Sequence, residues 1–164
     1  NFMEYMAFDA IVKHKLLDGK YIDKLKAEMS IQVMEFFRRP TVKALAASRR
    51  FAPAANIKEL AELAAQQVSL GNMAGEGWFL TGEMMELIEN GVANVICLQP
   101  FGCLPNHITG KGVMHALRQR YPESNIIALD CDAGTSEVNQ ENRIKLMLSV
   151  AKEKDPHKLS KDAV

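Results

Sequence analysis

Two short segments carry most of the side chains in this sequence that can do chemistry, and each follows an apolar run. The first, the cysteine loop Gln99–His107, presents the thiol of Cys103 between two prolines, with Gly102 free to form a tight turn. A thiol on a stiffened loop suits a metal ligand. The same residues also suit a structural turn with a packed cysteine, because free cysteine is among the most buried residue types. Both interpretations stay open at this point.

The second segment, the acidic loop Asp130–Glu137, places three carboxylates and two hydroxyls at the start of an expected helix. Helix capping accounts for one hydroxyl and for Glu137, whose charge is favourable at a helix N-terminus. Capping leaves the two aspartates, Asp130 and Asp132, unexplained. This loop is therefore a second candidate for a ligand-facing surface.

The cysteines offer part of a metal site. If the two apolar runs are neighbouring strands about 4.8 Å apart, Cys103 and Cys131 face one site with His107 nearby. Their spacing lacks the paired cysteines of a zinc knuckle, and three cysteines cannot fill the four thiolate positions of a usual iron–sulfur cluster. A complete cluster would need ligands from elsewhere. Cys97 lies inside an apolar run, where a core role is expected.

Other motifs do not match a nucleotide site or a catalytic triad. The sequence Gly110-Lys111-Gly112 has neither the Walker spacing nor a following Ser or Thr. Gly75-Glu76-Gly77-Trp78 lacks a preceding strand and the third glycine of a dinucleotide fingerprint, which leaves Glu76 as a candidate polar residue. No Ser-His-Asp or Cys-His-Asn order can be defended, so nucleophilic catalysis is not expected.

Periodicity predicts which elements hold these loops. Apolar residues at helical spacing predict a helix around Phe8–Leu16 and another over Tyr21–Arg38, stopped by Pro40. Asn56 with Glu59 three residues later predicts a capped helix that runs to Gly71. These helices are expected to supply packing.

From Gly71 onward helices and strands alternate. Apolar runs at 92–98 and 125–129 predict buried parallel strands, with helices expected over 80–89, 105–121 and 138–150. The expected fold is α/β, a three-layer doubly wound parallel sheet with an additional N-terminal helical segment. We expect residues 1–55 to form that segment, 56–153 the α/β domain and 154–164 a charged tail. Ligands bind such sheets outside the carboxyl ends of the strands, where both loops fall.

Composition narrows the function classes. The 20 basic and 20 acidic residues cancel, so no net field attracts nucleic acid or an anionic membrane. No apolar run approaches the roughly 20 residues of a membrane span, and no signal peptide is evident, which favours a cytoplasmic location. The chain opens on Asn1 and Phe2 within an amphipathic stretch, which we interpret as the start of a fragment of a larger protein.

Three sequence strings together resemble a known family. They are Gly75-Glu76-Gly77-Trp78-Phe79-Leu80-Thr81, Gln99-Pro100-Phe101-Gly102-Cys103-Leu104-Pro105-Asn106-His107 and Ser136-Glu137-Val138-Asn139-Gln140-Glu141-Asn142-Arg143. They are similar to a region of the large bacterial activase-related proteins of the 2-hydroxyacyl-CoA dehydratase family, the CoA-substrate-specific enzyme activases. The resemblance covers most of the chain and is sharpest over 75–153.

The resemblance implies a redox role. Family members join an ATPase domain to dehydratase-like regions, which hold [4Fe–4S] clusters through cysteines drawn from several subdomains. It implies that Cys103 is a cluster ligand, that ATP is bound by a domain not present here, and that the parent protein is an activase or reductase. Its partners would be other domains of the same polypeptide and a 2-hydroxyacyl-CoA dehydratase. The chain alone is expected to be folded but inactive.

We assign the remaining candidates by position. Gly102 and Pro105 would shape the cysteine loop, while four polar residues would lie near the cofactor or substrate: Asn106, His107, Asp132 and Glu137. Two other classes of function remain open. The domain could be a non-catalytic interaction module with Cys103 simply packed, or it could bind a nucleotide or CoA moiety at the strand ends.

Overall fold

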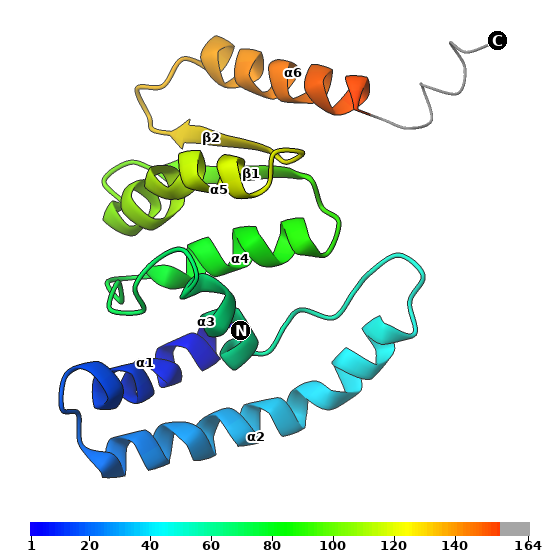
Figure 1. Cartoon of the computed structure of the whole chain (residues 1–164). Helices are drawn as coiled ribbons and strands as arrows, with labels where there is room; N and C mark the ends of the chain where they lie inside the picture. The colour runs from blue at the N-terminus through cyan, green and yellow to red at the C-terminus, as the bar shows by residue number, and fades with distance from the viewer. Residues whose placement is uncertain (155–164) are drawn as a thin grey trace. The chain divides into compact units, whose positions relative to one another are not determined.

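The computed structural model describes residues 1–154 (Figure 1), so the expected tail lies outside the described residues apart from Lys154. The chain divides into two compact units. The first unit spans Asn1–Glu86 and the second begins at Leu87. Each unit is described by itself.

Helices build the first unit around an aromatic core. It contains α1 (Phe2–Leu16), α2 (Tyr21–Ala46), α3 (Ile57–Ala64) and most of α4 (Trp78–Glu89). The ring of Trp78, only 1% exposed, packs edge-on against Tyr5 at 5.1 Å and Phe8 at 5.7 Å between centroids. Edge-to-face packing of this kind adds to the stability gained from burying the rings themselves.

Helix α2 continues past the proline predicted to stop it. It extends to Ala46 with Pro40 inside, so the predicted end at Arg38 is wrong. Proline removes one hydrogen bond and disturbs the turn before it, but it does not prevent the following residues from being helical. The residues of α2 that are buried against the unit are Ala27 and Ile31.

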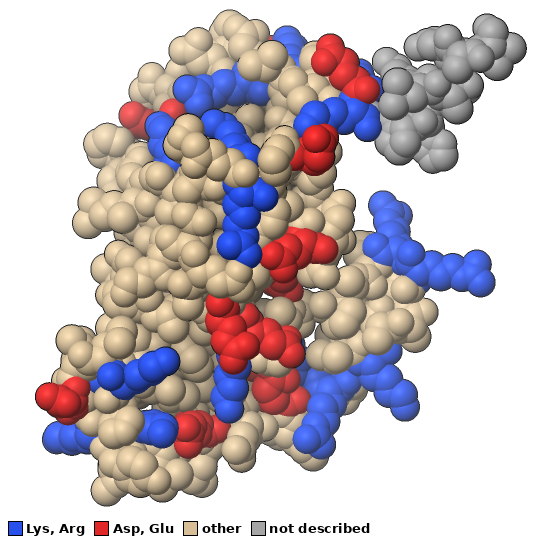
Figure 2. All heavy atoms as spheres, in the orientation of Figure 1, with Lys and Arg blue, Asp and Glu red and all other residues tan. Residues whose placement is uncertain are grey.

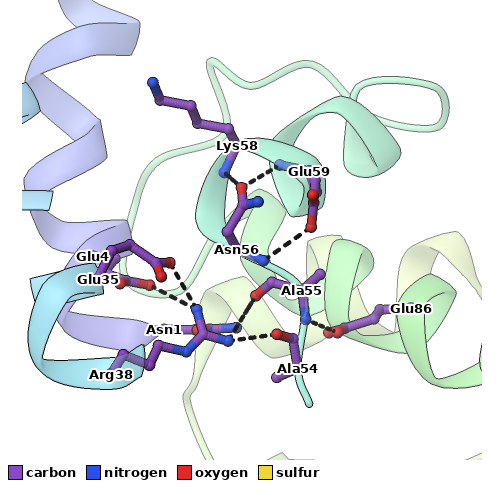
Figure 3. A network of polar contacts seen from close by, with 10 residues as sticks. All are labelled: Asn1, Glu4, Glu35, Arg38, Ala54, Ala55, Asn56, Lys58, Glu59 and Glu86. Carbon is purple, nitrogen blue, oxygen red and sulfur yellow. Dashed lines mark hydrogen bonds and ion pairs between the residues drawn. The ribbon is translucent and has the colours of Figure 1, made fainter. Parts of the chain in front are cut away.

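The segment before α3 is tied down by polar contacts (Figure 3). The Asn56 side chain accepts hydrogen bonds from the backbone N–H groups of Lys58 and Glu59, both at 3.0 Å, and Glu59 Oε2 accepts from the Asn56 N–H at 3.2 Å. This capping box confirms the predicted helix start. The helix ends at Ala64, earlier than the predicted limit at Gly71.

Arg38 joins this segment to two helices. Its guanidinium donates to Glu35 Oε1 at 2.9 Å and to the Ala55 carbonyl at 3.1 Å, and lies 3.6 Å from the buried Glu4 carboxylate (Figure 3). The Ala55 N–H in turn donates to Glu86 on α4. These contacts fix which side of α2 faces the unit.

A parallel pair of strands is the centre of the second unit. Strand β1 (Asn94–Pro100) pairs with β2 (Asn125–Cys131) in a register that runs from Asn94 opposite Asn125 to Pro100 opposite Cys131. Between them the chain forms a π-helical turn η1 (Asn106–Gly110), a 3₁₀ turn η2 (Lys111–Val113) and α5 (Met114–Arg120). Helix α6 (Glu137–Glu153) follows β2.

The three-layer doubly wound sheet predicted from the sequence is wrong. The described residues form six α-helices and a single two-stranded sheet. On the outer edge of β2, side chains occupy the carbonyls that a third strand would use. Ile126, Ala128 and Asp130 accept from Arg118, Arg143 and Gln140 respectively. Because these carbonyls are already paired, β2 needs no further strand on that side.

Strand β1 also differs from the prediction of a strand covered on both faces. Its residues alternate between exposed and buried. Val95, Cys97 and Gln99 point into the unit, whereas Ile96 and Leu98 are exposed. One face of this apolar strand is thus open within the second unit.

Two further observations concern surfaces. In the part of the chain that the structure describes, no helix has the combination of length and apolar composition that crossing a bilayer requires. On the face drawn in Figure 2, basic and acidic side chains are interspersed on both units. This fits the balanced charge of the sequence.

Candidate functional site

A glycine turn places Cys103 just beyond the end of β1. The Cys103 N–H donates to the Pro100 carbonyl at 3.1 Å, and Gly102 has φ 69°. This is the left-handed conformation that a type II turn requires at its third residue, where glycine has no steric penalty. The Phe101 N–H donates to the Cys131 carbonyl at 3.3 Å. The turn is therefore fastened to the end of β2 as well.

The residues after Cys103 hold the loop in place. Asn106 donates its side-chain amide to the Leu98 carbonyl at 2.8 Å, and the Pro105 carbonyl accepts from the Thr109 hydroxyl at 2.9 Å. The His107 N–H donates to the Cys103 carbonyl at 3.3 Å, while its imidazole is exposed. Gly102, Pro105 and Asn106 thus shape the loop, and His107 is free to face a partner or ligand.

The three cysteines lie in different environments. Cys97 is buried, Cys103 is half-buried and Cys131 is exposed. Gln99 donates to Cys97 Sγ at 3.1 Å, and a Cβ added to Gly110 would lie only 2.9 Å from the same sulfur. Burial raises the pKa of the Cys97 thiol, an effect that the Gln99 hydrogen bond opposes in part. Cys97 is a core residue.

The described residues do not form a complete metal centre. Within residues 1–154 no group of three or more His, Cys, Asp or Glu side chains is arranged to hold a metal ion. The constellation of Cys103, Cys131 and His107 considered from the sequence is therefore not assembled as a metal site. What the cysteine loop does supply is a single thiol on a turn with a defined conformation.

Exposed apolar side chains lie close to Cys103 in the sequence. Leu98, Phe101 and Leu104 are 53%, 81% and 62% exposed, and they lie within five positions of Cys103 along the chain. We call these three residues the apolar rim. Large apolar side chains that gather at an exposed loop are typical of a surface that another protein segment covers.

The acidic loop forms a separate polar surface. Asp132 is exposed, and its carboxylate accepts from the Gly134 N–H at 3.2 Å, which closes an Asx turn. Glu137 lies exposed in the first turn of α6, and Ser136 is the N-cap residue without a side-chain cap hydrogen bond. Asp130 pairs with Lys111 at 3.3 Å and Arg143 at 4.0 Å. The two candidates Asp132 and Glu137 are thus accessible, and neither accompanies Cys103 in a metal site.

A groove of about 620 Å³ runs beside this loop. Its walls are mostly polar and come from the end of β2, the acidic loop and α6, with Thr135, Ser136, Asn139 and Arg143 among the lining residues. The groove thus offers hydroxyls and amides near the N-terminus of α6 and the Arg143 guanidinium, groups that can bind an anion, although Asp130, which pairs with Arg143, also lines it.

Three residues near the two loops were not identified as candidates from the sequence. Gln99 is 1% exposed, and its Oε1 has no hydrogen-bond partner among the described residues. Arg143 connects α6 to β2, and its position seven residues after Ser136, two helical turns along the same face, was a signal that could have indicated it. Lys111 forms an ion pair with Asp130. The two residues are far apart in the sequence, so no local pattern predicts this contact.

The Gly75-Glu76-Gly77-Trp78 motif is structural. Gly77 has φ 46°, and the Trp78 N–H donates to the Asn72 carbonyl at 2.8 Å, so this turn directs Trp78 into the aromatic core. Tyr5 Oη donates to the Gly75 carbonyl at 2.8 Å. Glu76 is only half-buried in this turn, remote in sequence from both candidate loops.

Comparisons with protein-family models, with curated proteins and with solved structures find no match for this chain. The arguments for a function therefore come from the residues and their geometry.

Proposed function

We propose that this chain is a non-ATPase, dehydratase-like domain of an ATP-dependent activase-related redox protein of the 2-hydroxyacyl-CoA dehydratase family. In this proposal Cys103 is one ligand of an iron–sulfur cluster whose other ligands come from other domains of the polypeptide. The observation that carries the proposal is the thiol of Cys103 on a hydrogen-bonded glycine turn, beside the exposed apolar rim.

The apolar rim favours a shared site over an isolated one. A cluster in an electron-transfer protein is held by thiolates and surrounded by protein that limits solvent access and sets its potential. Cys103 alone cannot do this, but the side chains of Leu98, Phe101 and Leu104 offer a surface on which a second domain can close. The open face of β1, with Ile96 and Leu98, extends that surface.

Each residue then has a defined task. Gly102, Pro105 and Asn106 hold the turn, Cys103 ligates, and His107 lies exposed where it can donate a hydrogen bond. When bound, the cluster supplies transfer of one electron at low potential, as acyl-CoA dehydration requires. ATP hydrolysis belongs to a domain outside these residues, and a cytoplasmic acyl-CoA dehydratase is the electron acceptor in this proposal.

The test is cluster content in the full-length protein that contains this chain. Iron and acid-labile sulfide are measured under anaerobic conditions in the wild type, in Cys103→Ser and in Cys131→Ser. Cys131 is the matched control because it is the last residue of β2, opposite Pro100 at the same end of the sheet, and is exposed. We expect Cys103→Ser to lose cluster and Cys131→Ser to retain it. Equal cluster content in all three proteins would exclude Cys103 as a ligand.

A second candidate function is binding of a nucleotide or CoA phosphate group, and the polar groove along α6 favours it. In this case ligand binding to the folded state raises the melting temperature. We expect CoA or ATP to stabilise the chain, and Arg143→Ala to abolish the shift while Lys145→Ala, an exposed α6 variant outside the groove lining, retains it. No shift in the wild type at high ligand concentration would exclude this candidate.

A further inference from the structure

Helix α2 carries a second apolar face that the first unit does not use. Five large side chains, each 45–62% exposed, follow one another along it: Ile22, Leu25, Met29, Val33 and Phe36. We call these residues the apolar stripe. Four of them, Leu25, Met29, Val33 and Phe36, are among the apolar residues whose helical spacing predicts this helix from the sequence.

The stripe lies on the side of α2 opposite to its packing contacts. At about 100° per residue, Ala27, Ile31 and Arg38 lie between about 160° and 180° from Met29, whereas the stripe lies within about 40° of it. Ala27 and Ile31 are buried, and Arg38 is held by Glu35, Glu4 and the Ala55 carbonyl. A helix that is apolar on two opposite sides is one that packs between two layers.

The stripe is symmetric about its centre. Leu25 and Val33 lie four positions before and after Met29, and Ile22 and Phe36 lie seven positions before and after it. A copy of α2 laid antiparallel, with a two-fold axis at Met29, therefore sets Leu25 against Val33 and Ile22 against Phe36. An isologous interface requires this self-complementarity, whereas an unrelated partner does not.

The surface of the stripe has a depression into which a side chain of such a copy can pack. Met29, Gln32, Val33 and Phe36 line a depression of about 230 Å³. These are positions i, i+3, i+4 and i+7, the four residues that form a hole in knobs-into-holes packing. In the antiparallel arrangement the side chain that meets this hole is Leu25 of the second copy.

The size and polarity of the stripe also suit a dimer. A large side chain has on the order of 200 Å² of surface, so five that are about half exposed offer roughly 550 Å² per copy. With this area fully covered, two copies together bury about 1,100 Å², which is at the lower limit of roughly 1,000 Å² for a specific interface. No charged residue belongs to the stripe, as is typical of interface centres.

From these observations we infer that α2 is a homodimerisation helix, and that two copies of this chain associate through antiparallel packing of their apolar stripes. The inference does not depend on the proposed redox function, because the stripe belongs to the first unit and the cysteine loop to the second.

The test is the oligomeric state of the 164-residue chain, measured by sedimentation equilibrium over about a hundredfold range of concentration. We expect the wild type to approach twice the 18.3 kDa mass of one chain. Met29→Glu and Met29→Lys each place like charges opposite one another at the two-fold axis, so each should weaken the dimer by more than about a hundredfold. An equimolar mixture of the two variants should restore a dimer.

The control is Leu146→Glu, which adds the same charge at an exposed leucine on α6 and should leave the dimer unchanged. Far-UV circular dichroism checks that each variant is folded. A wild type that is monomeric at every concentration would overturn the inference. It would be overturned as well by a Met29→Glu variant that dimerises normally, or by a mixture of the two variants that stays monomeric.

Orientation is tested with single cysteines in a chain whose Cys97, Cys103 and Cys131 are replaced by serine. Leu25→Cys mixed with Val33→Cys should form a mixed disulfide faster than either variant forms a disulfide with itself, with the linked peptides identified by mass spectrometry. Faster self-linkage at position 25 would contradict the antiparallel arrangement.

Discussion

Replacing Gly77 with alanine is the change that the geometry of the first unit predicts to be most harmful. Gly77 has φ 46°, a conformation that costs an alanine about 1–2 kcal/mol. A Cβ there would also lie 1.9 Å from the Asn72 carbonyl oxygen and 2.9 Å from Tyr5 Oη, far inside contact distance. The Asn72 carbonyl must therefore move, which removes the acceptor of the buried Trp78 N–H at a further cost of about 1–3 kcal/mol.

These terms together give a loss of about 2–5 kcal/mol for Gly77→Ala. The matched control is Gly71→Ala in the same connection, where φ lies outside the left-handed region and the nearest obstacle is the Ser69 hydroxyl at 3.3 Å. A side chain can rotate away where a backbone carbonyl cannot, so we expect the control to change stability by no more than about 1 kcal/mol.

Urea unfolding followed by tryptophan fluorescence measures both variants, because the chain has one tryptophan and it is buried in the first unit. The free energy of unfolding is compared at constant m value. Equal losses in the two variants, or a loss below about 1 kcal/mol in Gly77→Ala, would show that the turn does not have the role assigned to it.

Three further predictions concern the cap, a buried phenol and the thiols. Asn56→Ala should lower the unfolding free energy of the first unit by about 1 kcal/mol through loss of the capping box, and an unchanged urea midpoint would contradict this. Burial raises the pKa of Tyr5 to about 12, so the folded unit keeps a proton that the unfolded chain loses near pH 10. Stability should therefore be full below pH 10 and fall by up to about 2–3 kcal/mol between pH 10 and 12, and a Tyr5→Phe variant with the same fall would refute the assignment. A thiol reagent at mildly alkaline pH should label Cys131 and Cys103 in the folded chain and Cys97 only after unfolding, whereas rapid labelling of Cys97 would show that it is not a core residue.

Local signals in the sequence predict much of the chain. Asn56 and Glu59 form the predicted capping box, and α4 ends at Glu89, the end expected for the helix over 80–89, with Gly91 at φ 87° just beyond it. The two apolar runs form parallel neighbouring strands. Such features depend on a few adjacent residues, so one sequence is enough to recognise them.

Features that depend on distant residues were not predictable. The sheet has no third strand beside β2, where Arg118, Gln140 and Arg143 pair with its outer carbonyls, and no local pattern marks a side chain as a replacement for a strand. The spacing of Leu25, Met29, Val33 and Phe36 identified a helix but not its packed side. Ala27 and Ile31 on the opposite side are the residues of α2 that are buried.

In the candidate site, too, the local feature was predictable and the arrangement of distant residues was not. The glycine turn around Cys103 follows from Gly102 and the flanking prolines, and it is present. Whether Cys131 and His107 would join Cys103 depended on side-chain directions, which strand spacing alone does not determine; within the described residues the three form no metal site.

Alkylation of Cys103 in the anaerobic full-length protein tests the central claim most directly. A ligated thiolate is protected from the reagent, so the account predicts that Cys103 is labelled only after iron is removed by a chelator, while Cys131 is labelled at the same rate before and after. Labelling of Cys103 at an equal rate with and without chelator would contradict the assignment of Cys103 as a cluster ligand.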